Sequence, residues 1–436
     1  MEFVKLTKDE FKKFASNHDQ ASFYQTVEWG HLKENNNWEM HLLGLKDKDK
    51  IVAAALVLSK ITPIKKKMFY SPRGFLIDYN NYELLKEFTK KIKEYVKKDN
   101  GIFIKIDPYL MYQQRDINGD IVPNGENNFK AFENLKKLGY KHFGFNLMLE
   151  ALQPRWIYVI NTKNKTIDEL LKDMDRKTRQ IIKTNEKYNI ECREIGFDEI
   201  SKFKDITKHT GDRREFIDRP LSYYENMYNC FHDSGILKII FAELNADGTI
   251  VELRKEKEEL EKDYDNRKNM HDNNIVHTNE KKYEQKQTEI MHNIERLDNK
   301  IKEIEQLKEK YGNIIVLSGI LFLIYGNEVV ALVGGSYKEV MNFQSFYYLN
   351  YKMLEYAVLN GYNRYNFYGI TGDFSESNPL YGLYSFKKDF GGEVVELIGE
   401  FDLIISKPYY YMYKVAFACY HKLKNVKNKI RLINKR

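Results

Sequence analysis

The sequence predicts an α/β protein with mixed sheets, built from two similar units, one of which is interrupted by an antiparallel pair of helices. Two observations lead to this class. The same order of elements, namely strand, turn, strand, helix, glycine and strand, occurs near the start of the chain and again near its end. Between the two copies, residues 251–312 have no proline and no glycine before Gly312, and charged residues dominate them.

The first copy lies within the first 110 residues. A turn separates two apolar strands, a helix with apolar residues at helical spacing follows, and a glycine precedes a buried strand. The strands 42–45 and 51–58 flank the turn 46–50, and Gly101 precedes the strand 102–106. The glycine stands where the end of a helix favours left-handed backbone.

The second copy repeats this order after the charged segment. Its parts are the strands 320–324 and 329–333 around the turn 325–328, a helix, Gly361, and the strand 365–368. Since helix, glycine and strand follow one another in many unrelated proteins, chance similarity is the alternative to duplication. The repeat predicts two units of similar build.

The charged segment predicts a long helical hairpin. Its 62 residues include 16 acidic and 14 basic side chains. Apolar residues in its second half recur with the 3.5-residue period of a coiled coil, at Tyr283, Ile290, Ile294, Leu297, Ile301, Ile304 and Tyr311. The polar stretch 269–279 suits a turn. At 1.5 Å per residue, two arms of about 25 residues project roughly 35–40 Å.

The hairpin interrupts a pair of strands. Leu237–Leu244 reads as a strand that ends in the turn signal Asn245–Gly248, and Ile314–Tyr325 reads as its partner. We therefore divide the chain into a first unit, two parts of a second unit, the arm between these parts, and a C-terminal segment that packs back on the first unit. The first unit is 1–150, and the two parts of the second unit are 151–250 and 313–400. The arm is 251–312, and the C-terminal segment is 401–436.

Composition excludes several classes of protein. Apolar residues make up 42% of the chain, so it can bury a core, and the three cysteines, Cys192, Cys230 and Cys419, have no metal-type spacing. No signal peptide is evident, and the longest apolar run is too short to span a bilayer. A cytoplasmic protein is expected, with no metal and no cofactor.

The net charge of +7 is concentrated at the C-terminus. Residues 414–436 hold eight Lys or Arg and no acidic residue, whereas the arm carries −2. Apolar residues at helical spacing, beginning at Val415, predict a basic amphipathic helix. Such a helix either packs as an ordinary surface helix or attracts an anionic membrane surface or RNA.

No strong catalytic motif is present, and no nucleophile stands beside a base, so any group transfer has to depend on positioning. Four stretches hold the candidate residues. In Ser22–Lys33, Trp29 and Leu32 suit a core, and Lys33 either points into a cleft or is a solvated helix lysine. In the second, Arg73 ends a strand where a guanidinium can grip a phosphate or carboxylate. Asp107 ends the strand after Gly101, and both residues also suit plain turns.

The third stretch is basic and the fourth is rich in glycine. The run Asp175–Lys183 predicts a helix whose cations Lys177, Arg179 and Lys183 suit phosphate or a solvated face. Farther on, Arg219 and Tyr223 share one face of a helix that starts near Pro220. In the fourth, a strand runs into a glycine-rich loop and then a basic loop, with candidate residues Tyr368, Asp373, Phe386, Lys387 and Lys388. Glycine permits a ligand to approach the backbone closely. The alternative is that both loops are ordinary surface turns.

Taken together, these stretches resemble the FemABX family of aminoacyl-tRNA-dependent peptidoglycan bridge transferases over almost the whole chain. The resemblance rests on Lys177–Arg179, Gly334–Ser336, Tyr365–Phe374, Phe386–Phe390 and Ile398–Asp402. The helical hairpin makes the chain similar to the FemA/FemB branch. The resemblance implies two GNAT-like domains flanking a cleft, and transfer of Gly, Ala or Ser from aminoacyl-tRNA to a stem-peptide amine of lipid II or UDP-MurNAc-pentapeptide, without a covalent enzyme intermediate.

The resemblance also implies roles for the candidate residues. Phe386 and Lys387 match a pair near the acceptor end of the tRNA, where Lys387 steadies the oxyanion or the terminal phosphates. Asp107 matches an acidic residue near the acceptor. The substrate-binding set is Lys33, Arg73, Arg219, Tyr223, Tyr368 and Asp373, and the tRNA-binding set is Lys177, Arg179, Lys183 and Lys388. A tyrosine that relatives carry before Gly334 is replaced here by the run Ala331–Val333.

Further partners are expected: the basic C-terminal segment favours peripheral contact with the inner membrane surface, and a dimer can form with a second copy or a related transferase. Two alternatives remain open. One is a GNAT-like acyl-CoA-dependent N-acyltransferase, for which Gly334–Ser336 is a faint candidate pyrophosphate loop. The other is a non-catalytic tRNA-binding protein built around the arm, although the arm's charge of −2 suits RNA poorly.

Overall fold

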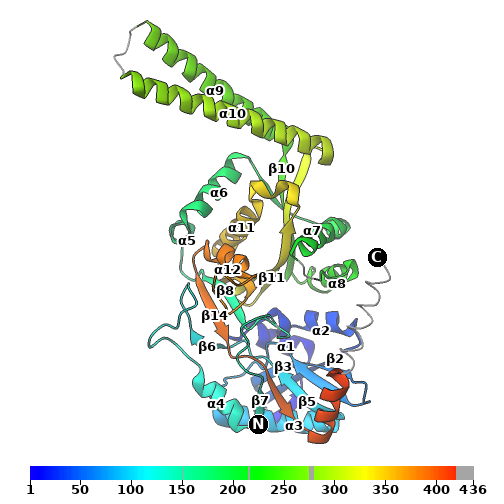
Figure 1. The fold of residues 1–436 in the computed structure, drawn as a ribbon. Coiled ribbons are helices and arrows are strands. Elements are labelled where there is room, and N and C mark those ends of the chain that lie inside the picture. The colour runs from blue at the N-terminus through cyan, green and yellow to red at the C-terminus, as the bar shows by residue number, and fades with distance from the viewer. Residues whose placement is uncertain (150, 215–216, 274–278, 419–436) are drawn as a thin grey trace.

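The computed structural model describes the chain except for residues 150, 215–216, 274–278 and 419–436. Two mixed β-sheets with helices on their faces form the body, and a pair of long helices projects from one end of it (Figure 1). The predicted fold class, two α/β units with mixed sheets and an inserted helical hairpin, is confirmed.

The first sheet has seven strands in the order β1-β2-β3-β4-β5-β15-β7. Its strands are β1 (Glu2–Lys5), β2 (Glu39–Asp47), β3 (Lys50–Ile61), β4 (Lys67–Ser71), β5 (Gly101–Ile106), β15 (Phe401–Ile404) and β7 (Tyr140–His142). The helices of this part are α1 (Lys8–Ser16), α2 (Val27–Glu34), α3 (Tyr82–Lys98) and α4 (Phe129–Lys137), with the 3₁₀ turn η1 (Phe23–Gln25). The apolar face of α3 is buried through Leu85, Phe88, Ile92 and Val96.

The second sheet has eight strands in the order β6-β14-β8-β13-β12-β11-β10-β9. Its strands are β6 (Met111–Gln114), β14 (Glu393–Leu397), β8 (Trp156–Asn161), β13 (Arg364–Ile370), β12 (Glu328–Ser336), β11 (Ile314–Tyr325), β10 (Leu237–Asn245) and β9 (Glu191–Glu194). Its helices are α5 (Ile167–Asp173), α6 (Arg176–Lys187), α7 (Ile200–Arg214), α8 (Leu221–Phe231), α11 (Ser345–Leu359) and α12 (Tyr381–Lys388), with the 3₁₀ turns η2 (Phe197–Glu199) and η3 (Lys338–Phe343). One hydrophobic cluster contains residues of both halves, among them Leu56 and Leu321.

The two sheets repeat one pattern, but not in the register that the sequence predicts. In each sheet, three antiparallel pairings lead to one parallel pair that flanks a helix: β4 and β5 around α3, and β12 and β13 around α11. Strands β2 and β3 therefore correspond to β10 and β11, and not to β11 and β12. The repeat pattern left out β4, although a strand end was expected at Arg73; β4 has five residues and begins in a run of lysines.

The chain crosses between the two sheets. Strand β6 lies in the first part of the chain but pairs with β14 at the edge of the second sheet. Strand β15 follows β14 but lies in the first sheet, between β5 and β7. Each half thus completes the sheet of the other, which joins them through backbone hydrogen bonds.

The glycines of the two repeats, Gly101 and Gly361, have different structural roles. Gly361 follows α11 with φ of 73°, the left-handed conformation that its position predicts. After α3 it is Asn100 that is left-handed, with φ of 59°, while Gly101 already belongs to β5. A Cβ at Gly101 would stand 2.4 Å from Val96 Cγ1, so this glycine permits close packing of strand on helix.

The arm consists of α9 (Ala246–Asp272) and α10 (Glu280–Tyr311), which lie side by side (Figure 1). The predicted turn at Asn245–Gly248 is wrong: the Asn245 side chain accepts a hydrogen bond from Gly248 N at 3.1 Å and so caps α9. The base of the arm is part of the main core, since Leu253 and Ile304 are buried there. Ion pairs such as Lys257–Asp298 (2.7 Å) join the helices farther out. That the two helices supercoil remains a prediction.

The start of the C-terminal segment packs on the first half. Residues 407–418 are helical, and Tyr410 and Tyr413 are buried against Phe103. Val415, the first apolar residue of the predicted amphipathic face, is exposed, because the two tyrosines supply the buried face instead. The predicted basic helix continues into 419–436, outside the described residues. In the part of the chain that the structure describes, no helix has the length and apolarity to cross a bilayer.

Candidate functional site

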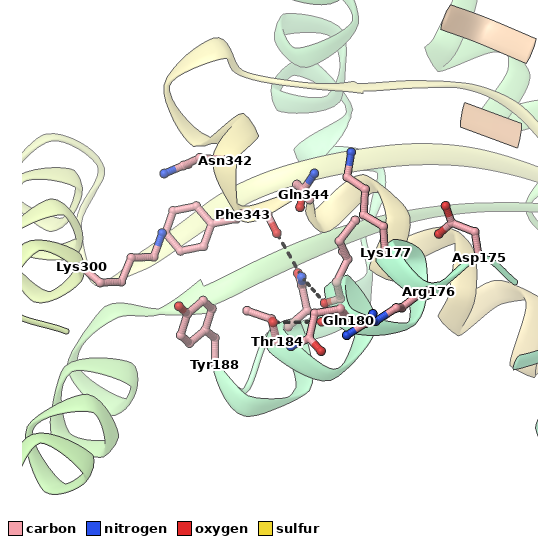
Figure 2. A pocket seen from close by; sticks show the side chains of 12 residues that line it. Asp175, Arg176, Lys177, Gln180, Thr184, Tyr188, Lys300, Asn342, Phe343 and Gln344 are labelled. Atoms are coloured by element: carbon pink, nitrogen blue, oxygen red, sulfur yellow. Dashed lines mark hydrogen bonds between the residues drawn. The ribbon is translucent and has the colours of Figure 1, made fainter. Parts of the chain in front are cut away.

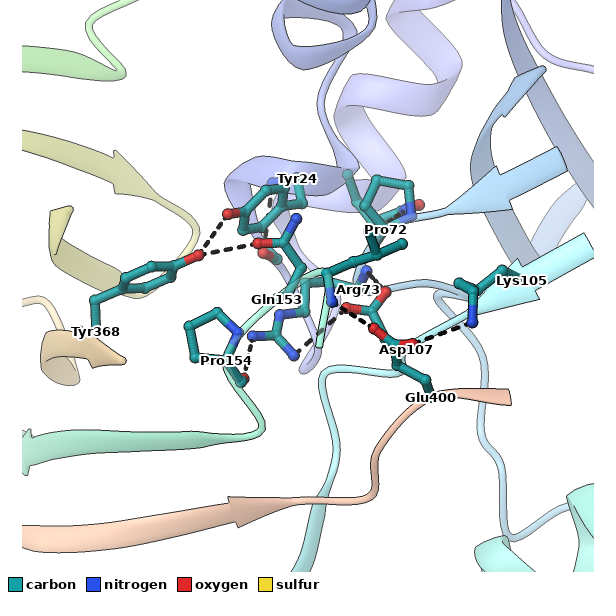
Figure 3. Close-up of polar contacts among 12 residues, drawn as sticks. Tyr24, Pro72, Arg73, Lys105, Asp107, Gln153, Pro154, Tyr368 and Glu400 are labelled. Carbon is teal, nitrogen blue, oxygen red and sulfur yellow. Dashed lines mark hydrogen bonds and ion pairs between the residues drawn. The ribbon is translucent and has the colours of Figure 1, made fainter. Parts of the chain in front are cut away.

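The halves meet at a group of polar side chains around Tyr368 (Figure 3). Tyr368 lies in β13 with a left-handed φ of 65°, which is unusual for a residue with a side chain. Its hydroxyl is 2.6 Å from the hydroxyl of Tyr24 in η1 and donates to Gln153 Oε1 at 3.0 Å. This arrangement ties the end of a strand in the second half to the first half.

Arg73 and Asp107 lie beside this group, at the ends of the parallel strands β4 and β5. Arg73 has a left-handed φ of 54°, and its backbone N–H donates to Asp107 Oδ1 at 2.9 Å. Its guanidinium donates to the carbonyl of Pro154 at 2.7 Å and lies 3.7 Å from Asp107 Oδ2. Both side chains are 3% exposed, so Arg73 binds its own chain and does not face an outside phosphate.

Asp107 is a buried carboxylate, and burial disfavours its charged form. Burial raises its pKa to about 6, although the neighbouring Arg73 acts in the opposite direction. A space of about 10 Å³ adjoins it, lined by Arg73, Gln153, Arg155 and Glu400 among others. That space is the size of a water molecule, so it leaves no room for a larger group beside Asp107 in this conformation.

Lys387 in α12 is a buried lysine aimed at β13. Its Nζ donates to the carbonyls of Gly369 at 2.6 Å and Tyr368 at 3.2 Å, and the residue is 5% exposed. Burial lowers the pKa of Lys387 to about 7. No carboxylate within the described ranges forms an ion pair with it. Two donors of a protonated ammonium are used, which leaves a third for another acceptor.

Lys33, Arg219 and Tyr223 form a second group across α2 and α8. Lys33 Nζ lies 4.2 Å from the centre of the Trp29 ring, and burial, helped by the charge of Arg219, lowers its pKa to about 8. The Arg219 guanidinium lies over the Tyr223 ring at 5.3 Å. Arg219 precedes α8 instead of lying on it, yet the predicted neighbours do meet. Trp29 and Leu32 are core residues, as predicted.

Three predicted site residues have local structural contacts. Asp373 accepts hydrogen bonds from the N–H and hydroxyl of Ser375, which makes it a turn residue. The Phe386 ring packs among aromatic side chains, with the Tyr347 ring 4.7 Å away. The Arg179 guanidinium donates to carbonyls at the end of α5, including that of Leu171 at 3.3 Å, so it caps that helix.

The other predicted RNA-binding cations differ in their surroundings. Lys177 and Lys183 are exposed on α6, and Lys388 donates to Asn118 Oδ1 at 2.8 Å. The candidate pyrophosphate loop Gly334–Ser336 is instead the end of strand β12, paired with β11. A Cβ on Gly335 would stand 1.9 Å from Thr210 Oγ1, so tight packing explains the glycine pair.

Sequence reasoning missed Tyr24 and Gln153. Tyr24 lies in a stretch that the sequence singled out, but an aromatic residue there reads as core, and Gln153 lies in an irregular connection without a pattern. Together with Tyr368 they place a left-handed strand end, a buried lysine and a buried carboxylate around the junction of the halves. Such an arrangement can hold a substrate, donate a hydrogen bond to a developing oxyanion and exchange a proton near neutral pH.

The structure defines a protein of two joined α/β units with a buried lysine at their junction, and comparison with known proteins gives its family. The model of the FemAB family matches residues 6–417, so the chain belongs to the FemAB family. Aminoacyltransferase FemA of Staphylococcus epidermidis is 36% identical over 417 residues, which cover 95% of this chain and 98% of that protein. Aminoacyltransferase FemA of Staphylococcus aureus (strain bovine RF122 / ET3-1) is 33% identical and covers 99% of this chain and 100% of its own.

A solved structure agrees with this family. The crystal structure of FemX superimposes with a TM-score of 0.78 at 27% identity, covering 94% of this chain and 99% of its own. The predicted family and the predicted class of enzyme are therefore confirmed: the protein is an acyl-transfer enzyme.

Proposed function

We propose that this enzyme moves an amino acid from aminoacyl-tRNA to an amine of the stem peptide of a peptidoglycan precursor. The donated residue is Gly, Ala or Ser, and the acceptor is lipid II or UDP-MurNAc-pentapeptide. The observation that carries the proposal is the match, over 95% or more of the chain, to aminoacyltransferases named FemA. The structure supports it with two related units that meet at a buried lysine, Lys387.

The chemistry needs little from the enzyme beyond position and charge. The acceptor amine attacks the ester carbon, a C–N bond forms, and the C–O bond to the tRNA ribose breaks. One proton leaves the amine and one is gained by the ribose oxygen. Lys387, through its remaining N–H, donates to the oxyanion that develops on the ester carbonyl. No covalent enzyme intermediate is required, because an aminoacyl ester is already activated.

The other groups orient the substrates. Lys33, Arg219 and Tyr223 offer two cations and a ring on one surface, which suits the phosphates and sugar of the precursor. Tyr368 presents its backbone to Lys387 and its hydroxyl to the first half. Asp107 acts through Arg73, whose guanidinium holds Pro154 in place. Lys177, Lys183 and Lys388 attract the tRNA.

Mass spectrometry of the acceptor tests the proposal. The protein is incubated with UDP-MurNAc-pentapeptide or lipid II and a mixed pool of charged tRNAs, with deacylated tRNA as the control. We expect the acceptor to gain the mass of one Gly, Ala or Ser residue. A parallel reaction supplies acyl-CoA in place of tRNA. Transfer from acyl-CoA but from no charged tRNA would overturn the proposal in favour of a GNAT-like N-acyltransferase.

The cellular setting is part of the same proposal. A lipid-linked acceptor places the enzyme at the cytoplasmic face of the membrane, and a dimer with a related transferase would let bridge residues be added in succession. Sedimentation velocity and flotation with anionic vesicles measure the two associations separately. A monomer at micromolar concentration that stays with the soluble fraction at low salt would contradict this setting.

A further inference from the structure

A cavity of about 840 Å³ lies between α6 and the base of the arm (Figure 2). We call it the arm-base pocket and define it by its lining residues, which are Asp175, Arg176, Lys177, Gln180, Ile181, Thr184, Asn185, Tyr188, Lys300, Asn342, Phe343 and Gln344. In Figure 2, Lys300 and Tyr188 lie at one end of the view, and Lys177 and Asp175 lie at the other. Three elements far apart in sequence, α6, α10 and η3, therefore build one pocket.

The lining combines cations, amides and a ring. Arg176 and Lys177 are exposed and form no ion pair in the part of the chain that the structure describes. Lys300 stands with its Nζ 3.6 Å from the centre of the Phe343 ring, inside the pocket wall. The amide side chains of Gln180, Asn342 and Gln344 add donors and acceptors, and Tyr188 is half-buried at the edge.

The nearby carboxylates are already engaged. Asp175 caps α6 by accepting a hydrogen bond from Thr178 N at 2.6 Å. Glu303 accepts from Lys300 at 3.0 Å and from the Asn342 amide. The pocket therefore presents two free cations and several amide groups to a ligand. Phosphates pair with such cations, and the edges of bases pair with such amides.

Helix α6 connects this pocket to the reaction site. At its start, Asp175 N donates to the carbonyl of Asp389, which follows directly on α12 with Lys387. At its end, Lys187 forms an ion pair with Glu256 of the arm at 2.5 Å, and the Tyr188 carbonyl accepts from Thr249 Oγ1. The 12 residues of α6 span about 18 Å. A ligand lying along α6 thus reaches from the arm towards Lys387.

We propose that the arm-base pocket binds unpaired nucleotides of the donor RNA, with their phosphates on Arg176 and Lys177 and a base beside Tyr188 and the amides. The inference rests on the proposed function, since it assumes that the acyl donor is a tRNA. A membrane surface fits less well, because the pocket is concave and rich in amides, whereas membrane binding favours protruding apolar and basic side chains.

Binding of deacylated tRNA, measured by fluorescence anisotropy, tests the pocket without the transfer reaction. The double variant Arg176→Gln/Lys177→Gln removes the free cations. Its matched control, Lys208→Gln/Lys302→Gln, removes two exposed lysines outside the pocket. For two phosphate contacts to a single strand, the salt slope falls by about 1.4 and affinity at 0.1 M salt by about 25-fold. We expect these changes in the pocket variant, and at most a threefold loss in the control.

A second variant, Gln180→Trp, fills the cavity without changing its charge. We expect weaker tRNA binding with an unchanged salt slope. An equal loss in the two double variants, or wild-type affinity of Gln180→Trp, would overturn the inference. Transfer by the wild-type enzyme is measured in parallel: if it uses charged tRNA while the pocket variants bind normally, the pocket inference alone fails. If the wild type uses no tRNA, the proposed function fails.

Discussion

The buried ammonium of Lys387 gives the most decisive prediction. Two of its N–H donors bind the carbonyls of Gly369 and Tyr368, and the third is free for an oxyanion. Removal of one preorganised donor of this kind lowers kcat by about 10²–10³-fold, or roughly 2.7–4 kcal/mol. We expect Lys387→Met to show this loss with little change in KM for the precursor. Lys387→Arg keeps a positive charge at any working pH and is the matched variant.

The pH dependence of Lys387 has a defined sign. Its pKa is lowered to about 7, so the protonated donor is lost as the pH rises through 7. We expect wild-type kcat to fall above about pH 7, and Lys387→Arg to be slower but without this fall. Single-turnover transfer at saturating precursor between pH 6 and 9 is the measurement. A collapse of precursor affinity with intact single-turnover chemistry would refute the role assigned to Lys387.

Stability gives an independent check on the same lysine. The unfolded chain binds a proton at Lys387 up to its ordinary pKa of about 10.4, whereas the folded chain releases it near 7. Between these values the unfolded state holds more protons, so the free energy of unfolding rises with pH, by at most about 1.4 kcal/mol per unit. We expect the wild type to lose stability relative to Lys387→Met as the pH falls from 10 to 7. A difference that does not change with pH would contradict the burial argument.

Three further predictions concern the substrate surface, strand β15 and the arm. Arg219→Ala should raise KM for the precursor about tenfold with kcat nearly unchanged, whereas Arg214→Ala should leave both near wild type; equal effects would exclude a specific contact. Phe401 lies in β15, which follows β14 along the chain but belongs to the first sheet. Phe401→Ala should lower the free energy of unfolding by about 3–5 kcal/mol and speed hydrogen exchange in β5, and exposed Val415→Ala is its control. Replacing residues 263–289 by a short turn should leave stability near wild type, whereas deleting 251–312 removes Leu253 and Ile304 from the main core and should prevent folding; thermal unfolding of both chains decides.

Local pattern was sufficient for most of the secondary structure. Apolar runs bounded by turn residues marked β10, β11 and β13, and the heptad spacing marked α10. It failed at short range where a capping residue looks like a turn residue, as at Asn245, and where a strand is short and begins with lysines, as β4 does. Asparagine serves both purposes because its side chain accepts a backbone hydrogen bond in either setting.

The candidate site was predictable only in part. Lys33, Arg219, Tyr223, Tyr368 and Lys387 were chosen because of their residue type beside loops, and the structure gathers them near the junction of the halves. Their partners Tyr24 and Gln153 could not be chosen, since each lies far along the chain from Tyr368. Arg73 and Asp107 illustrate the opposite outcome: they meet each other, and burial turns both away from solvent.

The sequence by itself determined that this protein is an α/β chain of two related units with a helical arm, because strand, helix and heptad periods are properties of neighbouring residues. It also determined the family, through motifs spread over the whole length. Only the tertiary structure decided that β6 pairs into the second sheet, that the base of the arm belongs to the core, and that α6 joins α12 to the arm. These facts depend on which distant segments pair and pack, and that choice is set by the burial and hydrogen bonding of the whole chain.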